Sequence, residues 1–96
     1  MLEIGKPIPK KTRKALSLFL KTADYHILGE KEDTPLKSST IRDLMRGVEI
    51  TNTDRMETAV KLIQYGLDKA CEVIKNLDEA KETIRIEMSN LKEVAA

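Results

Sequence analysis

The sequence predicts an all-α protein, a small helical domain of two N-terminal helices packed on a long C-terminal helix with heptad character. The first observation is a proline-free stretch over residues 53–94, where apolar residues recur at steps of three and four. The second is the composition, with 34% charged residues but only 4 Gly and 3 Pro among 96 residues. Such a composition is typical of helical proteins.

The apolar residues of the long helix follow a heptad register. One core position (a) holds Val60, Leu67, Ile74, Lys81 and Met88, and the other (d) holds Met56, Ile63, Ala70, Leu77, Ile84 and Leu91. This repeat places both sets along one seam that another helix can cover. A polar residue in such a seam, here Lys81, favours a dimer and fixes its register.

The two halves of this helix differ in character. Residues 56–74 are apolar almost all round, so we expect the N-terminal helices to wrap this half. From residue 75 onward charges multiply and the stripe narrows, which predicts a homodimer interface formed by Leu77, Lys81, Ile84, Met88 and Leu91. Parallel, antiparallel and four-helix arrangements are all compatible with the pattern, as is a helix that folds back near Asn76. Gly66 indicates either the close approach of another helix or a kink.

Three segments are predicted along the chain: an N-terminal arm (1–9), a helical core domain (10–74) and a helical extension for oligomerisation (75–96). The arm contains Gly5, Pro7 and Pro9. It either crosses a partner, crosses the surface of its own domain or is disordered.

The first helix is expected over residues 10–27. Its apolar residues form one stripe at helical spacing: Leu16, Phe19, Leu20, Ala23 and Ile27. A loop over residues 28–37 follows, and Gly29 can close the helix in a left-handed conformation.

The second helix is expected over residues 38–46. A hydroxyl can cap its first turn, supplied by Ser38, Ser39 or Thr40. Thr34–Pro35 offers an earlier start, because proline suits the first helical position. Gly47 is expected to end this helix, and Asn52 or Thr53 to cap the long one.

Charge is distributed unevenly although the total is only +1. Residues 1–48 contain ten Lys/Arg and six Asp/Glu, whereas residues 49–96 contain seven and ten. The N-terminal half is therefore where a polyanion would bind. Four cations crowd the start of the first helix, where the helix dipole disfavours positive charge: Lys10, Lys11, Arg13 and Lys14. They indicate either phosphate contacts or a solvated basic turn.

The sequence contains no catalytic or cofactor motif, so we expect neither an enzyme nor a metal or cofactor site. His26 is the only histidine and Cys71 the only cysteine, without HxxxH or CxxC spacing. We interpret His26 as a surface or half-buried residue and Cys71 as a packed, inert thiol. The lone cysteine, the lack of a signal peptide and the lack of a membrane-spanning run predict a soluble cytoplasmic protein without membrane partners.

Residues 38–67 read SSTIRDLMRGVEITNTDRMETAVKLIQYGL. A hydroxyl-capped short helix ends in Arg-Gly, and a polar linker leads to an apolar helix. This stretch resembles the recognition helix and the following helix of repressor-type helix-turn-helix DNA-binding domains. The resemblance implies a dimeric transcriptional regulator whose capped helix enters the major groove. It implies contacts to bases or adjacent backbone from Ser38, Ser39, Thr40, Arg42 and Asp43, and to phosphates from Lys10, Lys11, Arg13, Lys14 and Arg46.

The alternative function is a helical protein-interaction module, such as an adaptor, a small complex subunit or an inhibitor of a larger enzyme. The heptad helix would then be the assembly element, and the N-terminal helices would cap it. Single-stranded nucleic acid is a poor candidate, because its bases stack on aromatic side chains and the chain has one Phe, two Tyr and no Trp.

Overall fold

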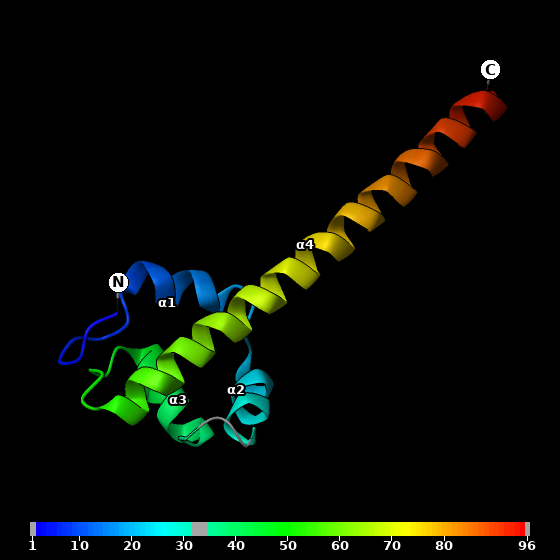
Figure 1. The fold of residues 1–96 in the computed structure, drawn as a ribbon. Coiled ribbons are helices and arrows are strands. Elements are labelled where there is room, and N and C mark those ends of the chain that lie inside the picture. The colour runs from blue at the N-terminus through cyan, green and yellow to red at the C-terminus, as the bar shows by residue number, and fades with distance from the viewer. Residues whose placement is uncertain (1, 32–34, 96) are drawn as a thin grey trace.

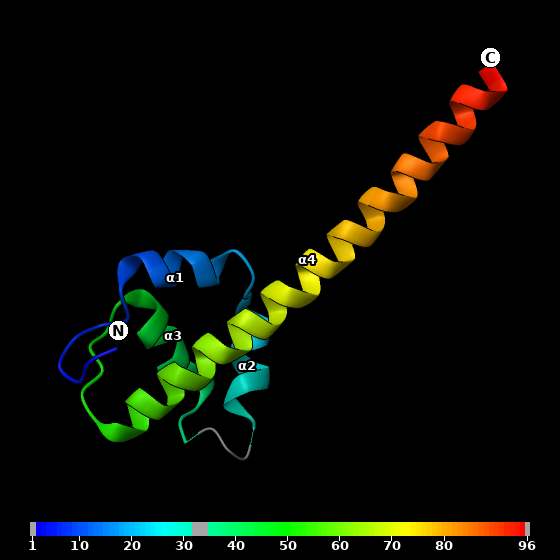
Figure 2. The ribbon, with the colours of Figure 1, turned by 45° about the horizontal axis from the view of Figure 1, so that its top comes forward.

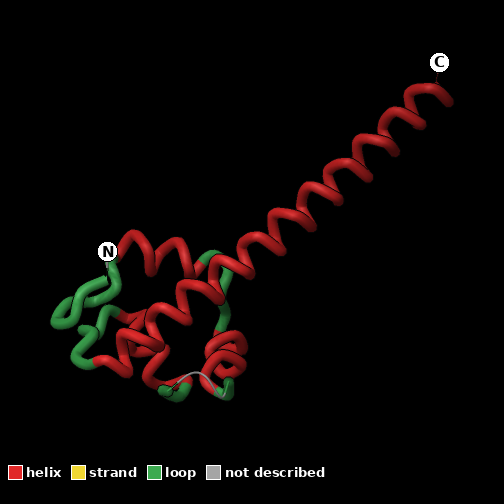
Figure 3. Tube along the Cα trace, viewed as in Figure 1, coloured by secondary structure: helices red, strands yellow, loops and turns green. Residues whose placement is uncertain are grey.

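The computed structural model describes residues 2–31 and 35–95, with side chains described as far as residue 92. Over these residues the chain forms four helices and no strand: α1 (Lys10–Ser17), α2 (Thr22–Gly29), α3 (Ser38–Arg46) and α4 (Thr53–Ala95). The all-α prediction and the long C-terminal helix are therefore confirmed (Figures 1 and 3). The 43 residues of α4 span about 65 Å at 1.5 Å per residue, which matches the 66 Å long axis of the molecule.

The three short helices gather around the first half of α4, and the second half extends away from them (Figures 1 and 2). We call residues 2–31 and 35–70 the head, and residues 71–92 the shaft. Within the head, α1 and α3 pack on α4, and α2 packs on α3. The core of the head is aliphatic and consists of Ile8, Leu16, Leu20, Leu28, Ile41, Leu44, Ile50, Ala59 and Leu62.

The single helix predicted over residues 10–27 is wrong, because the chain forms two helices separated by a turn at residues 18–21. The head therefore contributes three short helices rather than two. The amides of Leu18 and Phe19 donate to carbonyls three residues earlier, which tightens and ends α1. α2 begins where the backbone N–H of Lys21 donates to Oδ2 of Asp24 at 2.8 Å. An acidic side chain that bonds back to the N-cap amide stabilises a new helix start.

This break changes which residues of α2 face the core. Leu16 and Leu20 are buried, in agreement with the predicted stripe, but Ala23 and Ile27 are exposed. Leu28 is buried instead. Because a turn separates the two helices, the 3.6-residue periodicity of α1 does not carry over into α2. The apolar face of α2 therefore does not continue the stripe of α1.

The N-terminal arm packs on its own domain. Ile8 is fully buried. The N–H of Gly5 donates to the carbonyl of Ile50 at 2.7 Å, and the N–H of Ile50 donates to the carbonyl of Lys6 at 3.0 Å. Of the three alternatives for the arm, the structure therefore contains the one in which it crosses the domain's own surface, beside the loop between α3 and α4.

Two predicted helix caps are present. Gly47 ends α3 with φ of 101°, in the left-handed region that glycine adopts without strain. At the start of α4, the side-chain oxygen Oδ1 of Asn52 accepts the N–H of Arg55 at 2.8 Å. Both ends of the α3–α4 loop are thus fixed by local interactions.

The other two capping predictions are wrong. α3 begins at Ser38 with Lys37 as its N-cap and has no side-chain capping bond. Pro35 precedes the helix, and Thr34 lies outside the described residues. Gly29 is the last residue of α2 and is not left-handed. A Cβ at Gly29 would lie 2.6 Å from the backbone nitrogen of Ser38, so this glycine permits the close approach of α2 and α3.

Gly66 marks a close approach rather than a kink. α4 is helical without interruption through this position, and a Cβ there would overlap Cδ2 of Leu16. The missing side chain lets the buried Leu16 of α1 reach the backbone of α4. Helix α1 is thereby held directly on the long helix.

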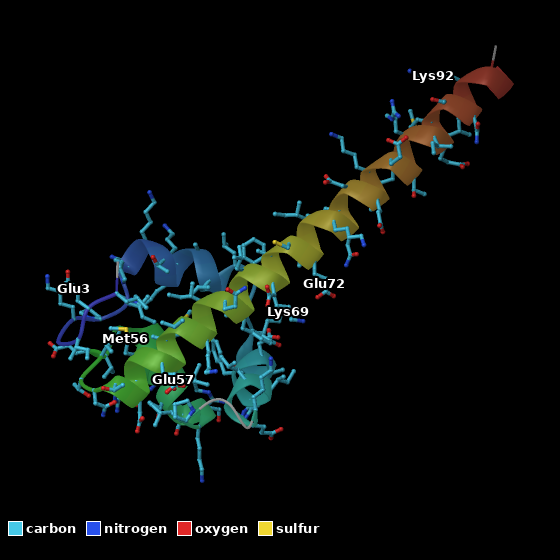
Figure 4. All side chains as sticks on the ribbon, in the orientation of Figure 1. Glu3, Met56, Glu57, Lys69, Glu72 and Lys92 are labelled. Carbon is cyan, nitrogen blue, oxygen red and sulfur yellow. The ribbon has the colours of Figure 1, made fainter. Side chains whose placement is uncertain are left out.

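The shaft is uncovered in the chain. All described side chains beyond Ala70 are exposed, so the wrapping expected up to residue 74 ends about one turn earlier, and within the wrapped half it leaves Val60 and Leu67 more than half exposed. Cys71 is exposed, and its prediction as a packed thiol is wrong. The helix also continues through Asn76 without folding back. Figure 4 shows shaft side chains projecting from the ribbon with no other element of the chain beside them.

Candidate nucleic-acid interface

An open cleft of about 630 Å³ lies between the three short helices. One face of α1, part of α2 and one face of α3 line it: Lys10, Arg13, Lys14, Ser17, Thr22, Tyr25, Arg42, Met45 and Arg46. The lining residues include five cations and no carboxylate. We call this site the basic cleft. Its three hydroxyls and five cationic groups are all able to donate hydrogen bonds to an anionic ligand.

Helical spacing explains why these side chains meet. Residues 10, 13, 14 and 17 are separated by three, four and seven positions, which places them on one face of α1. Residues 42, 45 and 46 share a face of α3 for the same reason. Lys11 lies about 100° around the helix from Lys10, on the side away from Arg13 and Ser17, and is not among the lining residues.

Arg13 occupies a fixed position at the edge of the cleft. Its Nε donates to the carbonyl oxygen of Ile8 at 2.9 Å. Its guanidinium also lies against Gly47, where a Cβ would come within 2.9 Å of Nη1. Arg13 thus joins the arm, α1 and the end of α3, and part of its hydrogen-bonding capacity is used within the chain.

Arg42 and Arg46 provide the cations of α3. Nη2 of Arg42 lies 3.1 Å from Nε2 of His26. A guanidinium can only donate hydrogen bonds, so Nε2 of His26 is the acceptor. Nη1 of Arg46 lies 3.7 Å from Oδ1 of Asp43, and the two side chains are 73% and 43% exposed. An exposed pair at this distance is weak and leaves Arg46 able to exchange it for another anion.

The structure brings together five of the ten predicted DNA-binding residues, namely Lys10, Arg13, Lys14, Arg42 and Arg46. The other five, Asp43 among them, lie outside the lining of the cleft. Ser38 borders a separate small hollow beside His26 and Glu30. Lys11 and Ser39 are exposed, and Thr40 is half-buried.

Tyr25 also lines the cleft, although the sequence pattern did not predict it. Its helical phase depends on the turn at residues 18–21, which the apolar pattern did not reveal. The pKa of Tyr25 is raised above 10.0, first by burial and then by the negative charge of Asp24. Its hydroxyl therefore remains protonated and able to donate at neutral pH.

Asp24 fixes the position of α2 relative to α4. Its Oδ1 accepts a hydrogen bond from the Tyr65 hydroxyl at 3.1 Å and lies 3.8 Å from Nζ of Lys69. Its other oxygen, Oδ2, accepts the N–H of Lys21. One carboxylate thus starts α2 and also attaches it to the long helix, which sets one wall of the basic cleft.

The predicted oligomer interface forms a second candidate surface, on the shaft. Its four apolar members are each more than half exposed, with 65% for Ile84 and 63% for Leu77. Lys81 is also exposed. These side chains share one seam of a straight helix, away from the basic cleft.

Comparisons with protein-family models, curated proteins and solved structures give no significant match to the chain. Within the described residues, no helix is both long enough and apolar enough to cross a membrane. Functional inference therefore depends on the two surfaces themselves.

Proposed function

We propose that the protein binds duplex DNA through the basic cleft and acts as a dimeric transcriptional regulator. The observation that supports this most is the convergence of five cations from α1 and α3 on one open cleft without a lining carboxylate. Cations clustered on one face are the electrostatic footprint expected of a nucleic-acid-binding protein. Like charges gathered on one open face repel each other in the free protein, and an anionic partner would relieve that repulsion.

The cleft cations would contact phosphates. Each phosphate neutralised by Lys or Arg releases condensed counterions, and the logarithm of affinity falls with that of salt by about 0.9 per contact. Five contacts would give a slope of about −4.5. The hydroxyls of Ser17, Thr22 and Tyr25 line the same cleft and can donate to phosphate oxygens between the cations.

Base contacts would come from the first turn of α3. Ser39 is exposed there and precedes Arg42 by three residues, so both lie on one face of the helix. In the helix-turn-helix domains that residues 38–67 resemble, this part of the recognition helix enters the major groove. The exposed face that joins Ser39 to the cleft cations supports the same docking direction here.

Duplex titrations at several salt concentrations test this proposal. Wild-type affinity should fall steeply with salt, and Lys10→Ala/Lys14→Ala should make the slope shallower by about 1.8. The matched control is Lys75→Ala/Lys92→Ala, which removes the same charge from the shaft and should leave the slope nearly unchanged. Equal effects of the two double variants, or no binding at low salt, would contradict a DNA site in the cleft.

The second candidate is a protein-interaction module that assembles through α4. The uncovered seam of the shaft favours it, because an apolar stripe of this length on a protruding helix is stabilised by a partner helix. Self-association is compatible with both functions. A protein that dimerises but does not bind duplex at any salt concentration would favour the module.

A further inference from the structure

The seam of the shaft indicates how two copies of the chain would pair. Ile74, Leu77, Ile84, Met88 and Leu91 are each more than half exposed, and Lys81 lies in the middle of this set. We propose that a second copy covers the seam in antiparallel orientation, with each Lys81 level with the partner's Ile84. This proposal rests on the proposed self-association and is independent of DNA binding.

Lys81 distinguishes the two orientations. In a parallel pair in register, each a residue faces its own copy, so the two Lys81 ammonium groups would lie opposite one another. In an antiparallel pair, a residues face d residues, and the d residues of the shaft are Leu77, Ile84 and Leu91. The stem of Lys81 can then pack on an aliphatic side chain while its charge reaches solvent. Antiparallel pairing therefore avoids a like-charge contact in the centre of the seam.

The residues flanking the seam are compatible with the same orientation. Asp78 and Arg85 both occupy the e position, directly after a d residue. With Lys81 level with the partner's Ile84, each Asp78 lies beside the partner's Arg85, which gives two opposite-charge pairs. A parallel pair would instead set Asp78 against Val73 and Arg85 against Ala80, and its opposite-charge pairs would join Glu87 to the partner's Lys92 near the end of the shaft.

The present partner of Arg85 does not prevent this pairing. Arg85 Nη2 bonds to Oε1 of Glu82 at 2.7 Å, on the same helix, with the two side chains 73% and 53% exposed. Exposed pairs of this kind contribute little to stability. Arg85 also has five N–H donors, so it can bond to Glu82 and to a second carboxylate together.

The register follows from charge and burial. The proposed overlap runs from Ile74 to Leu91, over about 27 Å, and forms six layers on exposed shaft residues only. If each helix were shifted by one heptad toward the head of its partner, Asp78 would lie against the partner's Asp78. Sliding two heptads would require Ile63, which already packs against the core of the head. A shift of one heptad away from the heads would remove two of the six layers.

Antiparallel pairing also separates the heads. The two Val60 positions would lie about 67 Å apart along the helix axis. A parallel pair would bring two cationic N-terminal halves to the same end, where they repel. The antiparallel dimer instead presents one basic cleft at each end.

The native cysteine supplies the test. Cys71 is exposed, is the only cysteine and lies just outside the overlap, so a nitroxide can be attached to it in the unaltered full chain. Pulsed electron paramagnetic resonance should give a distance between the two labels of about 35 Å, because 23 residues separate the two positions along the axis. A parallel pair would place them at the same level, across helix axes roughly 8–10 Å apart.

Two labelled variants serve as matched controls. Ile84→Asp should abolish the 35 Å distance, because residue 84 lies in a central layer. Ile86→Asp should retain it, because residue 86 lies on the opposite face of the helix. Both isoleucines are exposed in the single chain, so neither change disturbs the head. A distance below about 20 Å would overturn the antiparallel orientation, another long distance would overturn the register, and the absence of dipolar coupling would overturn pairing itself.

Discussion

The head and the shaft contain similar apolar residues in opposite environments. Leu44 in α3 is completely buried, whereas Leu77 in α4 is 63% exposed. The backbone of α4 is nevertheless the same continuous helix in both regions. A helix of this length gains most of its stability in a protein from the packing of its apolar face. The difference shows that the head obtains this packing within one chain, whereas the shaft has its seam available for another.

The largest expected effect separates these two environments. Leu44→Ala should lower the free energy of unfolding by about 2–5 kcal/mol, because it removes buried contacts and leaves a cavity. Leu77→Ala, the matched control, should change it by less than about 0.5 kcal/mol in the monomer. Denaturant unfolding at low micromolar concentration, followed by circular dichroism, measures both. A large effect of Leu77→Ala that does not change with protein concentration would show that the shaft is covered within the chain, whereas an effect that grows with concentration would come from pairing.

A smaller effect is expected where the head holds α1 on the long helix. Gly66→Ala should gain about 1 kcal/mol of helix propensity but introduce a methyl group that overlaps Leu16, at a cost of about 1–3 kcal/mol. We expect a net loss of about 1 kcal/mol in the free energy of unfolding. In a Leu16→Ala background the overlap is removed, and Gly66→Ala should then be stabilising. Stabilisation in the wild-type background would contradict the close approach.

An effect of similar size is expected for the hydrogen bond that joins α4 to α2. Tyr65→Phe removes the hydroxyl that donates to Asp24 at 3.1 Å, and we expect a loss of about 1 kcal/mol at neutral pH. Unfolding titrations at neutral pH measure it. Asp24→Asn in the Tyr65→Phe background should then cost less than in wild type.

The same tyrosine predicts a pH dependence. The pKa of Tyr65 is raised above 10.0, first by burial, then by the hydrogen bond and charge of Asp24 and by the charge of Glu72. The folded state therefore holds this proton more tightly than the unfolded state, so the stabilisation is fully present below pH 10 and is lost as pH rises above it. Wild type should lose more stability than Tyr65→Phe between pH 9 and pH 11. Tyr25, whose pKa is also raised, contributes the same sign in both proteins.

The sequence was most informative about α4. Its heptad register predicted a long helix and an apolar seam, because both follow from local periodicity. The turn at residues 18–21 was missed, because the apolar stripe continues across it in the sequence. The side chain of Asp24 stabilises the new helix start after this turn, because it bonds to Lys21 nearby and to Tyr65 in a distant helix. A tertiary contact of this kind leaves no periodic signal.

The basic cleft was predicted only in part for a similar reason. The excess of cations in the N-terminal half was visible, and five of the named residues do line the cleft. The i, i+3, i+4, i+7 spacing of residues 10, 13, 14 and 17 could have excluded Lys11. Thr22 and Tyr25 could not have been predicted as cleft residues, because the direction of their side chains depends on the start of α2 after the turn at residues 18–21.

Sedimentation equilibrium of the wild type, Ile84→Asp and Ile86→Asp tests the contrast between head and shaft most directly. The two isoleucines are both exposed in the single chain, but only residue 84 belongs to the seam. At tens of micromolar, the wild type and Ile86→Asp should sediment at about twice the chain mass of 10.9 kDa. Ile84→Asp should sediment as a monomer. A monomeric wild type, or equal behaviour of the two variants, would contradict the assignment of the shaft as a pairing surface.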